Sequence, residues 1–177
     1  HEDDPDRSQT VGIRFRNVYL PQGAQITSAY IQFDVDEDDK NYDPFNVTIT
    51  GEADSYSEAF VSSDYNISKR PRTTAFATWA DIPQWTTEHE RGPDQRTPDL
   101  SAIVQEIVNR DDWFGGNNMT FILEGTGQRT AESFDGAADN EDNPAIQRPT
   151  LVVTFVGEEE LPRVGKVRAS WNDDPAT

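Results

Sequence analysis

The chain has 177 residues, of which 33 are acidic and 15 are basic, so its formal net charge at pH 7 is -18. This charge disfavours binding to nucleic acid and to anionic membranes, and no apolar run approaches the roughly 20 residues of a membrane-spanning helix. The sequence contains no cysteine, which excludes disulfides and thiolate metal sites. A chain of this length can bury a substantial core within one domain.

Two alternating stretches near the N-terminus predict a pair of β-strands. Apolar and polar residues alternate from Val11 to Phe15 and again from Ile26 to Phe33, with one slip of phase near Ser28. The sequence LPQG between them has the proline and glycine of a tight turn. We therefore expect this stretch to form a hairpin whose apolar face packs against a second sheet.

Later stretches predict further strands and one helix. The strands are expected at Phe45–Ala53, Thr73–Trp79, Met119–Glu124 and Pro149–Val156. Pro98 to Arg110 predicts a short amphipathic helix, with Thr97 as its N-cap. Its apolar residues form one stripe, which consists of Leu100, Ile103, Val104, Ile107 and Val108. These elements together predict a mainly β, antiparallel β-sandwich.

Acidic residues cluster after the second predicted strand. Asp34, Asp36 and Glu37 stand at its end, where their oxygens can converge on a hard cation such as Ca²⁺. Asp173 and Asp174 form another acidic group near the end of the sequence. We expect these five residues to bind Ca²⁺, some of them across a boundary between copies. The alternative is a solvated acidic surface that maintains solubility.

Catalytic motifs are not evident in the sequence. It has two histidines, no G-x-S-x-G nucleophile elbow and no glycine-rich phosphate loop, so we expect no enzymatic activity. His89, between two glutamates, is interpreted as a surface loop residue. Tyr42 and Trp85 lie in predicted loops where a ring could stack on a sugar, whereas Trp79 and Trp113 fit buried positions.

Five phrases carry a resemblance to a known family: PQGAQITSAYIQFDVDE, TWADIPQW, RTPDLSAIVQEIVNR, ESFDG and PTLVVTF. They resemble the jelly-roll domains of the DNRLRE type, which are related to carbohydrate-binding modules and occur in large extracellular prokaryotic proteins. The resemblance covers about Val11 to Val156 and implies a non-catalytic jelly-roll sandwich, extracellular or at the cell surface. Family members usually open with a strand bearing a phrase similar to SDDAEE, and residues 1–8 do not resemble it.

A comparable acidic phrase follows the predicted domain instead. The chain is expected to divide into a β-sandwich domain, an acidic spacer and a C-terminal extension strand, at 1–156, 157–163 and 164–177. The apolar residues expected at a subunit contact are Val164, Val167, Ala169 and Trp171. A strand exposed in solvent would leave its backbone groups unpaired, so we expect it to be donated to the next copy or repeat.

The predicted function is therefore structural. We expect a subunit or repeat of an extracellular filament or adhesive stalk that assembles head to tail by donor strand complementation with calcium support. Its partners would be further copies of the same chain. The alternative is a carbohydrate-binding module of a secreted enzyme, whose partner would be a polysaccharide.

Overall fold

The computed structural model describes residues 9–134, 137, 146–156 and 167–168. Its strands are β1 (Gln9–Val18), β2 (Gln25–Gln32), β3 (Tyr42–Glu52), β4 (Arg72–Ala80), β5 (Asn117–Gln128), β6 (Thr150–Val156) and β7 (Val167–Arg168). The helical elements are the 3-10 turn η1 (Pro93–Gln95) and the helix α1 (Ser101–Val108). Among these described residues, no helix is long and apolar enough to cross a membrane.

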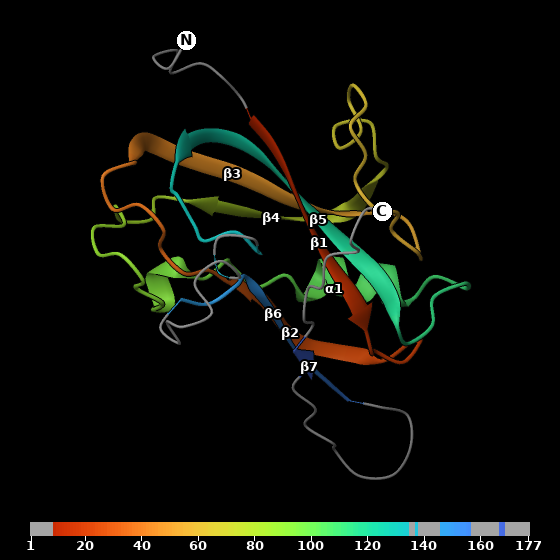
Figure 1. Cartoon of the computed structure of the whole chain (residues 1–177). Helices are drawn as coiled ribbons and strands as arrows, with labels where there is room; N and C mark the ends of the chain where they lie inside the picture. Colours follow the sequence, from red (N-terminus) through yellow and green to blue (C-terminus); the bar gives the residue numbers. More distant parts are fainter. Residues whose placement is uncertain (1–8, 135–136, 138–145, 157–166, 169–177) are drawn as a thin grey trace.

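Two antiparallel sheets of unequal size face each other. The larger sheet has the strand order β1-β5-β3-β4. The smaller sheet consists of β2 and β6, with the two residues of β7 paired to the outer edge of β6. Figure 1 shows the smaller sheet lying beneath the larger one, with α1 beside them. The expected mainly β, antiparallel fold with one short helix is confirmed.

The first two strands do not form the predicted hairpin. β1 pairs with β5, whereas β2 pairs with β6, so the turn between them carries the chain from one sheet to the other. Leu20 and Ala24 are buried at this crossing. The hairpin prediction was wrong because alternation reports which face of a strand is buried and not which strand is its neighbour. The slip of phase is confirmed, since the β2–β6 register shifts between Ile26 and Ser28.

Helix α1 is shorter than predicted and begins at Ser101. Thr97 does not cap it, because the Thr97 hydroxyl accepts a hydrogen bond from the N–H of Ile31 on β2. The N-cap position is held by Leu100, which makes no side-chain capping bond, and the Asp99 carboxylate accepts hydrogen bonds from the N–H groups of Ser101 and Ala29. The start of the helix is thereby tied to β2. The predicted apolar stripe is confirmed, as all its members are buried: Leu100, Ile103, Val104, Ile107 and Val108.

Aromatic rings fill the core where β3 begins. The Phe33 and Trp79 rings stack with their centroids 5.7 Å apart, and Phe45 meets Trp79 edge-on. Trp85 lies against the same pair, 6.2 Å from the Trp79 ring. Trp79 and Trp113 are both buried, as expected from the sequence.

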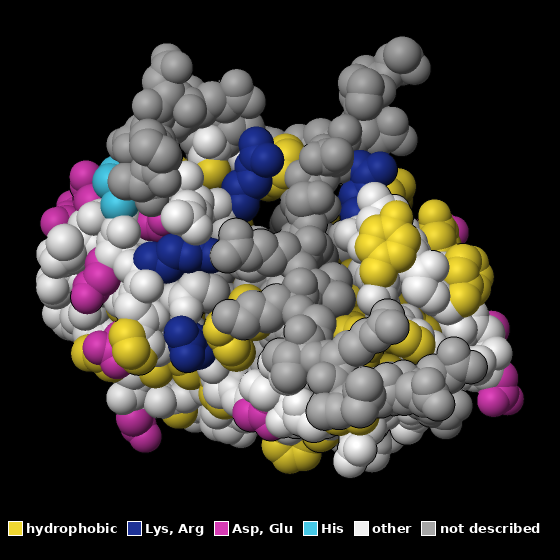
Figure 2. Space-filling view, turned by 90° about the horizontal axis from the view of Figure 1, so that it is seen from below, with side chains coloured by type: hydrophobic (Ala, Val, Ile, Leu, Met, Phe, Trp, Pro, Cys, Tyr) yellow, Lys and Arg dark blue, Asp and Glu magenta, His cyan; other side chains and the backbone are white. Residues whose placement is uncertain are grey.

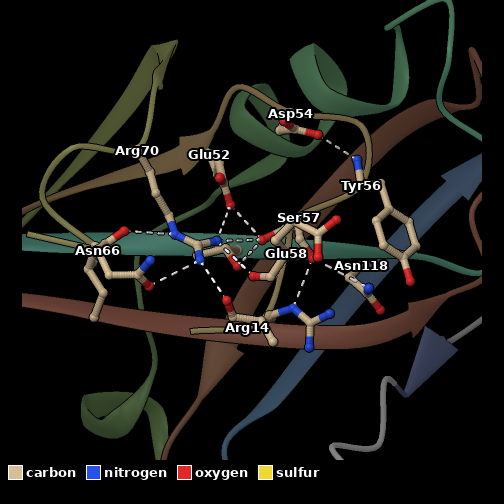
Figure 3. Close-up of polar contacts among 12 residues, drawn as sticks. Arg14, Glu52, Asp54, Tyr56, Ser57, Glu58, Asn66, Arg70 and Asn118 are labelled. Atoms are coloured by element: carbon tan, nitrogen blue, oxygen red, sulfur yellow. Dashed lines mark hydrogen bonds and ion pairs between the residues drawn. The ribbon is translucent and has the colours of Figure 1, made fainter. Parts of the chain in front are cut away.

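A buried ion pair holds the long loop at 53–71 against the larger sheet (Figure 3). Arg70 Nη1 lies 2.8 Å from Glu52 Oε2, and both side chains are only 8% exposed. The Ser57 hydroxyl donates to the same Glu52 oxygen and contacts the Thr120 hydroxyl on β5. These contacts connect the loop to two strands of the larger sheet.

We expect Arg70→Ala to lower the free energy of unfolding by about 3–5 kcal/mol, because the Glu52 carboxylate would stay buried without its partner. Arg72→Ala is the matched control. The side chains of the Arg72–Glu124 pair are 22% and 39% exposed, and exposed pairs contribute only about 0–1 kcal/mol. Urea unfolding followed by tryptophan fluorescence measures both variants. Equal midpoints would contradict a dominant role for the buried pair.

Candidate functional site

Charged side chains from three chain segments meet where β2 ends. Backbone hydrogen bonds run from the Glu132 N–H to the Asp34 carbonyl and from the His89 N–H to the Val35 carbonyl. Asp34, Asp36, His89 and Glu132 form what we call the acidic cluster. Its three segments are far apart in the sequence, so their proximity depends on the fold.

Asp34 is the most deeply buried member of the acidic cluster, with 0% of the residue exposed. Its Oδ2 accepts a hydrogen bond of 2.8 Å from the Gln147 N–H, while its Oδ1 is buried without a hydrogen-bond partner. Burial raises the pKa of Asp34, although the Gln147 N–H acts in the opposite direction. An ionised carboxylate is costly in such a position, so Asp34 favours binding a proton or a cation.

Glu132 and His89 are the members of the acidic cluster that come from outside the β2 segment. Glu132 is buried, and its pKa is raised first by burial and then by repulsion from Asp36. His89 Nδ1 lies 3.8 Å from a Glu132 carboxylate oxygen, and the imidazole side chain is 32% exposed. His89 also has a φ of 61°, a left-handed conformation that residues other than glycine rarely adopt. It is therefore more constrained than the surface loop residue that we expected.

Unpartnered polar atoms concentrate around the acidic cluster. Within the described residues, the buried side-chain atoms that lack a hydrogen-bond partner include Asp34 Oδ1, His89 Nδ1 and Thr130 Oγ1. Thr130 belongs to this region because its carbonyl accepts a hydrogen bond from the Asp36 N–H. Such atoms normally find partners, so this end of the sandwich has unused binding capacity.

The structure brings together only part of the predicted calcium site. Asp34 and Asp36 lie in the acidic cluster, Glu37 is exposed, and Asp173 and Asp174 lie outside the described residues. In the described ranges, no three Asp, Glu, His or Cys side chains are placed to hold a metal ion. Because Ca²⁺ takes about six to eight oxygen ligands, these carboxylates would supply only a fraction of a site. Glu132 was not predicted, since no local pattern links it to β2.

The outer edge of β2 is occupied by the chain itself. Residues from Gln95 to Gln105 bond to backbone groups of Ile26, Ala29, Ile31 and Phe33. On the larger sheet, the Glu106 carboxylate accepts hydrogen bonds from the N–H groups of Thr74 and Ala75 on β4. These contacts make further strand addition at either place unfavourable.

The outer edge of β6 carries β7. Val167 and Arg168 pair antiparallel with Val153 and Val152 of the same chain. The other residues expected at a subunit contact lie outside the described residues: Val164, Ala169 and Trp171. For two residues, therefore, the strand extends the sheet of its own chain, and donation to another copy stays a prediction.

The outer face of the smaller sheet carries basic side chains. Figure 2 views the molecule from this side and shows dark blue Lys and Arg side chains among hydrophobic ones. Arg96 donates to the Gln32 side chain and stacks on Tyr30, with its guanidinium carbon 4.3 Å from the ring centroid. Arg91 donates to the Thr150 hydroxyl on β6. Although the chain is acidic overall, this face carries positive charge beside Gln32 of β2 and Thr150 of β6.

An apolar cleft of about 490 Å³ opens between the two sheets. Residues that line it include Val11, Ile13, Leu123, Trp79, Trp85 and Pro149. Val11 is 47% exposed although the next residue on its face, Ile13, is buried. The smaller sheet thus leaves part of the inner face of the larger sheet uncovered.

The two residues predicted to stack on sugars lie in different environments. Tyr42 begins β3 and is 54% exposed. Trp85 is only 2% exposed, and its indole N–H donates to the Asp94 carbonyl. Trp85 therefore offers no exposed ring face at the surface and borders the apolar cleft instead.

No protein-family model, no curated protein and no solved structure matches this chain.

We expect the free energy of unfolding of the calcium-free protein to depend on pH through the buried Asp34 carboxyl. Because burial raises the pKa of Asp34, its favourable contribution is complete below the ordinary value near pH 4 and is lost as the pH rises through the raised pKa. Asp34→Asn removes this dependence. Between pH 4 and pH 7 the variant should therefore gain stability relative to the wild type, as measured by urea unfolding.

Asp43→Asn is the control with the opposite sign. A hydrogen bond from Arg129 lowers the pKa of Asp43, so the ionised carboxylate stabilises the fold. This contribution is complete above the ordinary value near pH 4 and is lost as the pH falls through the lowered pKa. The variant should therefore be less stable than the wild type by a constant amount between pH 4 and pH 7, and the difference should close at lower pH. If both variants change in the same direction, the assignment of Asp34 as a destabilising buried carboxyl is wrong.

Proposed function

We propose that this chain is a structural subunit or repeat of an extracellular filament or adhesive stalk, in which units join by strand addition at the outer edge of β6. The observation that carries this proposal is that the β6 edge accepts an antiparallel strand, since Val167 and Arg168 of the same chain pair with it. A strand from a neighbouring unit can use the same backbone donors and acceptors. With this strand in place, the smaller sheet would approach the jelly-roll arrangement that the family resemblance implies.

The register predicts which residues of an added strand would face the core. Val167 lies opposite Val153, and continuing this register gives Ala169 opposite Leu151 and Trp171 opposite Pro149. Side chains directly opposite each other share a face of the sheet, and Leu151 and Val153 are buried. The apolar residues of the added strand would therefore be buried, and the alternating polar residues would face solvent.

The acidic end of such a strand would complete the calcium site. Continuing the same register puts Asp173 opposite Gln147, whose N–H binds the Asp34 carboxylate. We propose that Ca²⁺ bridges Asp34 and Asp36 on one side and Asp173 and Asp174 on the other. This arrangement supplies carboxylates that the acidic cluster lacks and links cation binding to the joining of units.

A carbohydrate-binding module of a secreted enzyme is the second candidate, and the apolar cleft favours it. Ligand sites combine apolar and aromatic walls with a few polar groups. Here Trp79 and Trp85 line the cleft together with Arg129 and Glu132. A monomer whose migration is retarded by polysaccharide in native gels would support this function over the structural one.

Removal of calcium tests the proposed cation site. We expect melting at a higher temperature in millimolar Ca²⁺ than in EDTA, because a cation that binds only the folded state stabilises it by mass action. Asp36→Asn should reduce the shift, whereas Asp64→Asn, at an exposed loop position, should leave it unchanged. Identical melting of the wild type in the two buffers would contradict a functional calcium site.

A cysteine pair tests strand addition, because the chain has no cysteine of its own. Ser170→Cys combined with Thr150→Cys puts two thiols opposite each other in the continued register. If units exchange strands, oxidation should give disulfide-linked ladders in denaturing gels, and the ladders should lengthen as protein concentration rises.

Ser170→Cys combined with Thr27→Cys is the matched control, since Thr27 is exposed on β2 rather than β6. It should give no ladder. A disulfide that forms only within single chains at every concentration would overturn the proposed assembly. The absence of any disulfide in the Thr150 pair would overturn the register.

A further inference from the structure

We infer that the apolar cleft is the binding site for the indole of Trp171, the last apolar residue of the strand that adds to β6. This inference rests on the strand addition that the proposed function uses, but not on which copy supplies the strand. It assigns an occupant to the cleft and identifies Trp171 as the main anchor of the junction.

The cleft lies where an added strand would bring Trp171. Pro149, which the continued register puts opposite Trp171, is one of the residues that line the cleft. The facing wall belongs to the larger sheet and includes Val11 and Leu123, which are paired with each other. An inward side chain at this point of the strand would therefore enter the space between the sheets.

The chemistry of the cleft fits an indole. Its volume of about 490 Å³ falls within the roughly 300–1,000 Å³ of sites that hold small organic ligands. A buried tryptophan also needs an acceptor for its N–H. Thr130 lines the cleft, and its buried Oγ1 has no hydrogen-bond partner. The cleft thus offers both apolar walls and a hydroxyl oxygen that can accept this bond.

Trp171 is also the sole aromatic residue in the sequence after residue 156. The half-exposed side chain of Val11 is the kind of apolar surface that such a ring would cover. Large aromatic side chains that fill a pocket usually dominate the energy of a junction. Trp171 is therefore expected to matter more than Val167 or Ala169.

Acrylamide quenching of tryptophan fluorescence in the full chain tests this inference. The sequence has four tryptophans, and Trp79, Trp85 and Trp113 are at most 5% exposed. If Trp171 occupies the cleft, the wild type should be as resistant to quenching as Trp171→Phe. A quenchable fraction present in the wild type and absent from Trp171→Phe would overturn the inference.

A variant of the cleft wall provides an independent test. Val11→Asp puts a charge into the cleft at a half-exposed position and should create a quenchable fraction that disappears in the Val11→Asp, Trp171→Phe double variant. Val61→Asp is the matched control, because Val61 is 60% exposed in the loop at 53–71. It should leave the quenching unchanged. A folded Val11→Asp protein that still protects Trp171 would contradict the proposed site.

Native mass separates this inference from the proposed function. A monomer with a protected Trp171 would support the cleft as its binding site and overturn assembly between units. A polymer with a quenchable Trp171 would overturn the cleft as its site while leaving strand exchange in place.

Discussion

The apolar inner face of the larger sheet is too wide for β2 and β6 alone to cover. On one side, α1 and the residues before it fill the gap, since their buried stripe packs beside β2 and β4. On the side of β1 no described element does the same, and there Val11 stays half exposed and the cleft opens. The edge of β6, which β7 pairs for only two described residues, adjoins this uncovered region. A single added strand would therefore satisfy two requirements, backbone pairing and burial of apolar surface.

The polar features gather at the same end of the sandwich. The acidic cluster contains buried carboxyl groups with raised pKa values, and the positive charge of Arg91, which donates to Thr150, acts on Asp34 from nearby. An incoming acidic segment would meet both signs of charge over a short distance. Such an arrangement favours one direction and one register of docking, because a shift would separate the charges from their partners.

The sequence was informative where a local pattern reports burial. Alternation located the strands, the phase slip at Ser28 marked a bulge, and the helical stripe from Leu100 to Val108 was buried throughout. No local sequence pattern predicts which distant segments contact each other. The hairpin prediction failed for this reason, and the approach of His89 and Glu132 to Asp34 went unforeseen. Trp85 was misjudged because a loop can still direct a large ring into the core.

The covalent connection between β6 and β7 favours their pairing within one chain. Residues 157–166 connect the two strands, which keeps the tail of each unit close to its own edge. Two segments that are joined by a short stretch of chain meet at an effective concentration on the order of millimolar. The tail of another unit competes with the chain's own tail only when the concentration of units exceeds this effective concentration. In dilute solution the tail of a free chain would therefore pair with its own β6. If units join as proposed, crowding at a surface or covalent linkage in tandem would shift the balance, and the number of residues between β6 and β7 would set the concentration at which units connect.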